Sequence, residues 1–94
     1  MIGQVIRLKV QAGKVEEFEA LVSQLMRDVV DHEPGAIYEV RRVRGQERTY
    51  LYFISFPDQA AFDRYMTAGY HTQMSPQAVA LLEGEPLFEE LDNF

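Results

Sequence analysis

The first third of the chain changes from a strand-like to a helical pattern of apolar residues. Apolar side chains alternate with small or charged ones over residues 2–10, which predicts a β-strand. From Lys14 onward the apolar residues fall three or four apart, as on one face of an amphipathic helix of about five turns. They are Val15, Phe18, Leu21, Leu25 and Val29. Pro34 and Gly35 end this helix, because proline cannot continue one.

The pattern predicts three further strands in the rest of the chain. Two of them, over residues 36–44 and 49–56, flank a hairpin loop at residues 44–48. A short last strand covers residues 86–91. All of these segments are rich in β-branched, aromatic or other apolar residues and are bounded by glycine, proline or charged residues, as strands usually are.

Two more helices are predicted between the third and the last strand. The first begins at residues 57–58 and is broken at residues 68–69. Ser75 and Pro76 form a strong helix start, with the serine as N-cap and the proline in the first turn, and Gly84 closes that helix. The order is β-α-β-β-α-α-β, a ferredoxin-like α+β layout in which one antiparallel sheet is backed by helices.

The third predicted strand is apolar on both sides. Residues 50–56 contain a single small polar residue, Ser55, whereas a strand with one wet face alternates apolar and polar residues. Helices cover only one face of the sheet, so we expect the sheet of a second copy to cover the other, giving a homodimer. The alternative is an exposed, aggregation-prone strand. Leu51 and Phe53 lie on one side of the pleat, and the pattern leaves open which side meets the partner.

Length and composition narrow the class of protein. Ninety-four residues fit one domain over residues 1–94. The chain has no cysteine, which excludes disulfides and thiolate metal sites and suits a reducing cytoplasm. A net charge of -6 argues against nucleic acid as a partner. The N-terminus is not that of a signal peptide, and no stretch approaches the roughly 20 apolar residues that span a bilayer, so no membrane association is expected.

The order and spacing of several short segments resemble the antibiotic-biosynthesis-monooxygenase (ABM) family of dimeric α+β barrels. The resemblance covers nearly the whole chain. It implies homodimers whose sheets pack face to face. It also implies, for many members, oxygenation of phenols or quinols without metal or flavin, and for others small-ligand binding. The segments are residues 13–18, Glu33-Pro34-Gly35 before a strand with Tyr38, residues 50–53, residues 58–62, and a late helix ending near Leu82.

The polar residues of this chain depart from the family pattern. The family's third strand often carries a glutamate where this chain has Ile54. Its second helix usually ends in a histidine where Tyr65 stands. A second histidine commonly follows where Tyr70 stands, next to an aromatic residue at the place of His71. His71 is thus displaced by one position from the expected histidine.

The resemblance and the residue types together single out a group of candidate site residues. Cofactor-free oxygenation needs a base that removes a phenolic proton, and His71 is the histidine in the matching segment. Its alternative is an exposed histidine in a loop. Tyr65 and Tyr70 are candidates to orient a substrate, or else to pack in the core. The candidate lining of an apolar substrate pocket is Tyr50, Tyr52, Ile54, Phe62, Met66 and Met74.

The charged residues and the histidines outside this group give weaker indications of a functional site. Four arginines cluster around the predicted hairpin, either as a solvated tip or as a site for an acidic ligand or for the partner's acidic C-terminal segment; they are Arg41, Arg42, Arg44 and Arg48. His32 lies at a helix end, where it is expected to interact with the helix dipole. Two separated histidines without HExxH spacing, and the absence of GxGxxG and Walker motifs, predict neither a metal nor a cofactor.

Two functions remain open at this point. The first is a cofactor-independent monooxygenase that acts on a small aromatic such as a quinol or polyketide phenol. The second is a small-ligand-binding or stress-related dimeric module that has lost the polar catalytic groups. A purely structural dimer is a weaker third possibility. Ile54 in place of an acid favours binding, whereas His71 close to two tyrosines is compatible with catalysis.

Overall fold

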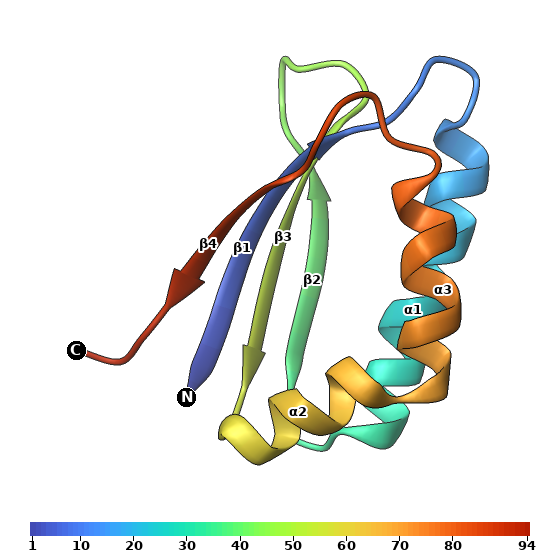
Figure 1. Ribbon diagram of the computed structural model, residues 1–94. Coiled ribbons are helices and arrows are strands. Elements are labelled where there is room, and N and C mark those ends of the chain that lie inside the picture. The colour runs from blue at the N-terminus through green and yellow to red at the C-terminus, as the bar shows by residue number, and fades with distance from the viewer.

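The computed structural model describes residues 1–94 as a four-stranded antiparallel sheet with helices on one face (Figure 1). The strand order is β2-β3-β1-β4, and the order of elements along the chain confirms the predicted ferredoxin-like layout. The elements are β1 (Ile2–Lys9), α1 (Val15–His32), β2 (Ile37–Arg42), β3 (Thr49–Phe56), α2 (Gln59–Thr67), α3 (Gly69–Val79) and β4 (Leu87–Leu91). None of the helices combines the length and the apolar character that crossing a membrane requires.

The two faces of β3 have different surroundings. Tyr50, Tyr52 and Ile54 point toward the helices and are buried in the core. Leu51 and Phe53 point to the opposite face, where these residues are 37% and 41% exposed. Figure 1 shows all three helices on one side of the sheet. The face that carries Leu51 and Phe53 is therefore the open one.

The open face combines apolar residues with two adjacent rows of opposite charge. The register places Phe53 beside Val5, with Glu39 and Glu89 at the two ends of this row. The neighbouring row runs across the same four strands and carries two arginines; its members are Arg41, Leu51, Arg7 and Leu87. Because Arg41 also contacts Glu39 at 3.1 Å, the charges of neighbouring rows already balance within one chain.

The start of the third helix differs from the prediction. We expected Ser75 and Pro76 to begin it, but α3 begins at Gly69 and ends at Val79, so Pro76 lies inside the helix. Residues 70, 74 and 78 are spaced four apart and pack against the core. Burial of this helical face outweighs the backbone hydrogen bond that a proline cannot donate. His71 consequently lies in the first turn of a helix rather than in a loop.

Candidate functional site

A cavity of about 200 Å³ lies between the helix-facing side of the sheet and the three helices. Twelve of its sixteen lining residues are hydrophobic. The sheet contributes Ile6, Leu8 and Ile54, α1 contributes Leu25, and α3 contributes most of the opposite wall. The cavity opens between α3 and β4, where the lining residues Val79 and Phe88 are more than half exposed. Such a cavity suits a small, largely apolar ligand.

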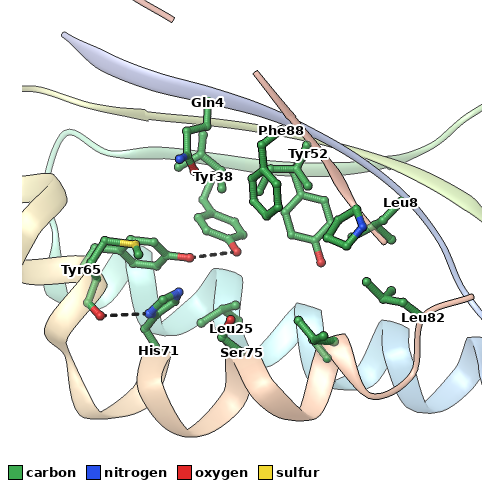
Figure 2. Close-up of a pocket in the computed structure, with 16 residues that line it drawn as sticks. Gln4, Leu8, Leu25, Tyr38, Tyr52, Tyr65, His71, Ser75, Leu82 and Phe88 are labelled. Atoms are coloured by element: carbon green, nitrogen blue, oxygen red, sulfur yellow. Dashed lines mark hydrogen bonds between the residues drawn. The ribbon is translucent and has the colours of Figure 1, made fainter. Parts of the chain in front are cut away.

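The polar groups of the cavity gather at one end. Figure 2 shows Gln4 and Tyr38 projecting from the sheet toward Tyr65 and His71 on the helices. Leu8 and Leu82 lie at the other end, with Tyr52 and Phe88 between the two ends (Figure 2). A ligand that fits this arrangement has a polar end and an apolar body.

Tyr38 and Tyr65 form a buried pair of hydroxyl groups. The Tyr65 hydroxyl donates a hydrogen bond of 3.2 Å to the Tyr38 hydroxyl. Since this bond uses one of two hydroxyl hydrogens, the other is free for a ligand. Burial raises the pKa of Tyr65 to about 12, even though the hydrogen bond with Tyr38 acts in the opposite direction. Burial also raises the pKa of Tyr38 far above its ordinary value. Both hydroxyls therefore remain protonated donors at neutral pH.

His71 has one ring nitrogen available to the cavity. Its Nδ1 lies 3.2 Å from the carbonyl oxygen of Met66. A carbonyl only accepts hydrogen bonds, so Nδ1 carries the hydrogen and Nε2 of the neutral ring keeps a free lone pair. Burial lowers the pKa of His71 below its ordinary value, and the hydrogen bond to Met66 offsets this only in part. The ring is thus neutral at pH 7 and can accept a proton.

Tyr52 adds a further donor along the cavity wall. Its hydroxyl points into the cavity (Figure 2), and the chain itself offers no hydrogen-bond partner to it. Burial raises the pKa of Tyr52, which keeps its hydroxyl protonated. An oxygen atom of a bound ligand at this position can accept the hydrogen bond that the Tyr52 hydroxyl does not donate to any group of the chain.

The structure brings five of the candidate site residues together around the cavity. They are Tyr52, Ile54, Tyr65, Met66 and His71. Met66 is 43% exposed, and Ile54 lies deep in the floor. Tyr65 and His71 are the closest aromatic pair, with ring centroids 4.3 Å apart.

The other candidates lie outside the cavity lining. The Tyr50 hydroxyl donates to a carboxylate oxygen of Glu19 on α1. Phe62 packs behind Tyr65, with ring centroids 6.4 Å apart. Met74 packs against the core from α3. The Tyr70 hydroxyl is buried without a hydrogen-bond partner, and its ring stacks on His32 with centroids 5.0 Å apart.

Sequence reasoning missed several lining residues, among them Gln4, Ser75 and Phe88. For Gln4 a signal existed, because it interrupts the apolar side of the first strand between Ile2 and Ile6. No comparable signal marks Ser75, whose place on the cavity wall depends on the early start of α3. Phe88 belongs to an edge strand, where a buried and an exposed face are difficult to distinguish from sequence.

The arginine cluster takes part in local ion pairs away from the cavity. Arg42 binds Glu19 through two hydrogen bonds of 2.7 and 2.8 Å. The pKa of Glu19 is held below its ordinary value by Arg42 and, secondarily, by Tyr50. Arg48 donates to the Val10 carbonyl oxygen at 2.7 Å. His32 Nδ1 lies 2.8 Å from the Asp28 carbonyl oxygen in the last turns of α1.

Solved structures with the same fold come from distantly related organisms. A candidate antibiotic biosynthesis monooxygenase from Caulobacter crescentus is 29% identical, with a TM-score of 0.92 over 99% of this chain and 89% of that one. A second, from Deinococcus radiodurans, is 14% identical, with a TM-score of 0.85 over 100% of this chain and 93% of that one. A conserved protein from Methanosarcina mazei is 21% identical, with a TM-score of 0.87 over 96% and 89%.

Sequence comparison points to one family. No curated protein matches the chain. A model of the family described as antibiotic biosynthesis monooxygenase matches residues 1–77. This segment includes β1 to β3, α2 and most of α3, and with them the residues that form the polar end of the cavity. The chain therefore belongs to the antibiotic biosynthesis monooxygenase family.

Proposed function

We propose that this protein is a cofactor-independent monooxygenase for small aromatic substrates that carry a phenolic hydroxyl. The observation that carries the proposal is the free Nε2 of a neutral, half-buried His71 at the polar end of an apolar cavity. The tyrosine hydroxyls beside it are donors for the oxygen atoms of the substrate. A base, hydrogen-bond donors and a water-poor pocket are the three requirements of this chemistry.

The reaction begins with transfer of the phenolic proton to His71 Nε2. The resulting anion gives one electron to dioxygen, and the two radicals combine to form a carbon–oxygen bond. The peroxide then takes up a proton and loses water, which leaves a carbonyl on the substrate. One oxygen atom enters the product and the other leaves as water, with all electrons supplied by the substrate. Donation from Tyr38 or Tyr65 to a substrate oxygen stabilises the negative charge that develops in the first step.

The size of the cavity limits the substrate. About 200 Å³ is smaller than the roughly 300–1,000 Å³ typical of pockets for drug-sized ligands. One ring or two fused rings therefore fit better than a long polycyclic system. The apolar end, with Leu8 and Leu82, accommodates a ring or short alkyl substituent.

A second copy of the chain is the proposed partner, and its sheet covers the open face. Leu51 and Phe53 form the apolar centre of that face. If the strands of the partner run in the opposite direction, the row with Arg7 and Arg41 lies over the row of the partner that contains the glutamates, so that opposite charges meet. Face-to-face packing also removes the exposed apolar area that a lone sheet would present to water.

The alternative is a ligand-binding module without catalysis, and one observation favours it. Ile54 lies in the cavity floor at the position where the family often has a glutamate, so this wall offers no acid at that point. Oxygen uptake with a panel of one-ring and two-ring quinols and naphthols, in the presence of a chelator, separates the two functions. Stoichiometric oxygen uptake with a bound phenol supports the monooxygenase. Binding of the panel without uptake contradicts it and supports the binding module.

A further inference from the structure

One row of side chains across the cavity floor contains a polar pair next to Ile54. On the helix-facing side of the sheet, Ile54 is paired with Gln4 of β1 in the β-sheet register, and Gln4 is paired with Glu90 of β4. Tyr38 of β2 occupies the other end of the same row. In this row β3 carries no polar side chain, but the next two strands do: Gln4 on β1 and Glu90 on β4.

The amide of Gln4 has a defined orientation. Its Nε2 donates a hydrogen bond of 3.2 Å to Oε1 of Glu90. A carboxylate only accepts hydrogen bonds, so the amide nitrogen faces Glu90 and the carbonyl oxygen Oε1 faces away from it. No donor of the chain reaches this oxygen. Because the Gln4 side chain lines the cavity, its Oε1 is an unused acceptor at the polar end.

We propose that Gln4 is a specificity-determining residue, whose Oε1 accepts a hydrogen bond from a second hydroxyl or amino group on the aromatic ligand. Glu90 is a positioning residue, because it holds the amide in the required orientation. This inference rests on the proposed function, in which His71 Nε2 takes the proton of the first hydroxyl. The preferred ligand then carries two hydrogen-bond donors, and a ligand with a single donor leaves Oε1 unpaired.

A neutral amide suits this place better than a carboxylate would. Proton transfer to His71 leaves a negative charge on the substrate, and a carboxylate in the cavity floor would oppose that charge at short range. Gln4 supplies an acceptor without a charge, while the charge of Glu90 remains at the solvent-exposed edge of the sheet. The pair therefore recognises a second donor without hindering ionisation of the first.

The test compares two probes that differ in one hydrogen-bond donor, namely 1,4-dihydroxynaphthalene and 4-methoxy-1-naphthol. Binding is measured by calorimetric titration without oxygen, so that no turnover occurs. Wild type is expected to bind the diol about tenfold more tightly, the size of one hydrogen bond. Gln4→Leu should bring the two affinities within about twofold. Glu90→Gln should reduce the preference, whereas Glu89→Gln, a neighbour on the open face, should leave it unchanged.

Each outcome bears on a separate claim. Equal affinities in wild type, or a preference that survives Gln4→Leu, would overturn the role of Gln4 while leaving the aromatic cavity intact. A wild-type preference in Glu90→Gln, combined with its loss in Gln4→Leu, would overturn only the positioning role of Glu90. If folded wild type binds neither probe, the proposed function itself is contradicted. Far-ultraviolet circular dichroism of each variant establishes that a lost preference does not reflect unfolding.

Discussion

The ring of Tyr65 at the end of α2 and the imidazole of His71 at the start of α3 lie with their centroids 4.3 Å apart. The two helices meet at Ala68, whose extended backbone turns the chain between them. This turn brings a hydroxyl donor and a proton acceptor to the same end of the cavity. The two side chains are brought together by the backbone conformation of Ala68, between the two helices. For this reason neither Tyr65 nor His71 identifies the site by itself.

The open face of the sheet should mediate dimerisation. Phe53→Asp and Leu51→Asp each place a charge in the apolar centre of that face, and should convert a dimer into a monomer because an unpaired charge cannot be buried there cheaply. Sedimentation equilibrium at micromolar concentration measures the mass. Val30→Asp is the control, since Val30 is an exposed apolar residue on α1. A monomeric wild type, or a Phe53→Asp variant that remains dimeric, would contradict the assignment.

The ion pair of Glu33 and Arg64 should respond asymmetrically to mutation. The Glu33 side chain is only 7% exposed, whereas that of Arg64 is 62% exposed, and their closest atoms are 2.9 Å apart. Arg64→Met leaves a buried carboxylate unpaired and should therefore lower the free energy of unfolding more than removal of the carboxylate does. Glu33→Gln leaves only an exposed guanidinium and should cost about 1 kcal/mol or less. Urea unfolding measures both; equal losses would show that burial does not control the pair.

Protonation of His71 should destabilise the fold. Burial lowers its pKa below the ordinary value of 6.5, so below about pH 6.5 the unfolded chain binds a proton that the folded chain resists. Stability contributed by the neutral ring is therefore lost as the pH falls through this range. Urea unfolding at pH 7.5 and pH 5.5 should show a larger loss for wild type than for His71→Gln. Equal losses in the two proteins would show that His71 titrates in the folded state as it does in the unfolded state.

Removing the hydroxyl of Tyr65 or of Tyr52 should affect protein stability differently but ligand affinity similarly. Tyr65→Phe removes the hydrogen bond to Tyr38 and should lower the free energy of unfolding by about 1 kcal/mol. Tyr52→Phe should leave stability nearly unchanged, because its hydroxyl has no partner in the chain. Both variants should lose affinity for 1,4-dihydroxynaphthalene by up to about tenfold. A Tyr52→Phe variant that binds as well as wild type would show that this hydroxyl does not contact the ligand.

Most of the fold could be predicted from sequence because its signals are local and agree with one another. The bounds of β3, residues 49–56, match the prediction, and α1 ends just before Pro34 as expected. The start of α3 could not be predicted in this way. A serine–proline pair is a strong local signal, but packing of residues 70, 74 and 78 against the core, which is a tertiary effect, places it inside the helix.

The candidate site was predictable only in segments that could be matched to the family, even though the residues at Tyr65 and His71 differ from the family's usual ones. His71, Tyr65 and Tyr52 line the cavity, and each stands in a segment that resembles the family. Tyr70 stands in the same segment, but the helical period turns it toward His32 instead. Gln4 and Glu90 are far apart in sequence, and only the pairing of β1 with β4 brings them together. Such pairings depend on strand register, which local patterns do not specify.

In the proposed reaction, His71 is the base of a cofactor-free oxygenation. Oxygen consumption with 1,4-dihydroxynaphthalene, in the presence of a chelator, tests it most directly when wild type and His71→Gln are compared from pH 5 to pH 8. This role predicts a wild-type rate that rises with pH and levels off above the lowered pKa of His71, because only the neutral ring accepts a proton. It also predicts a loss of about 10²- to 10⁴-fold in the variant. A substrate that turns over at the same rate in both proteins would contradict this role of His71.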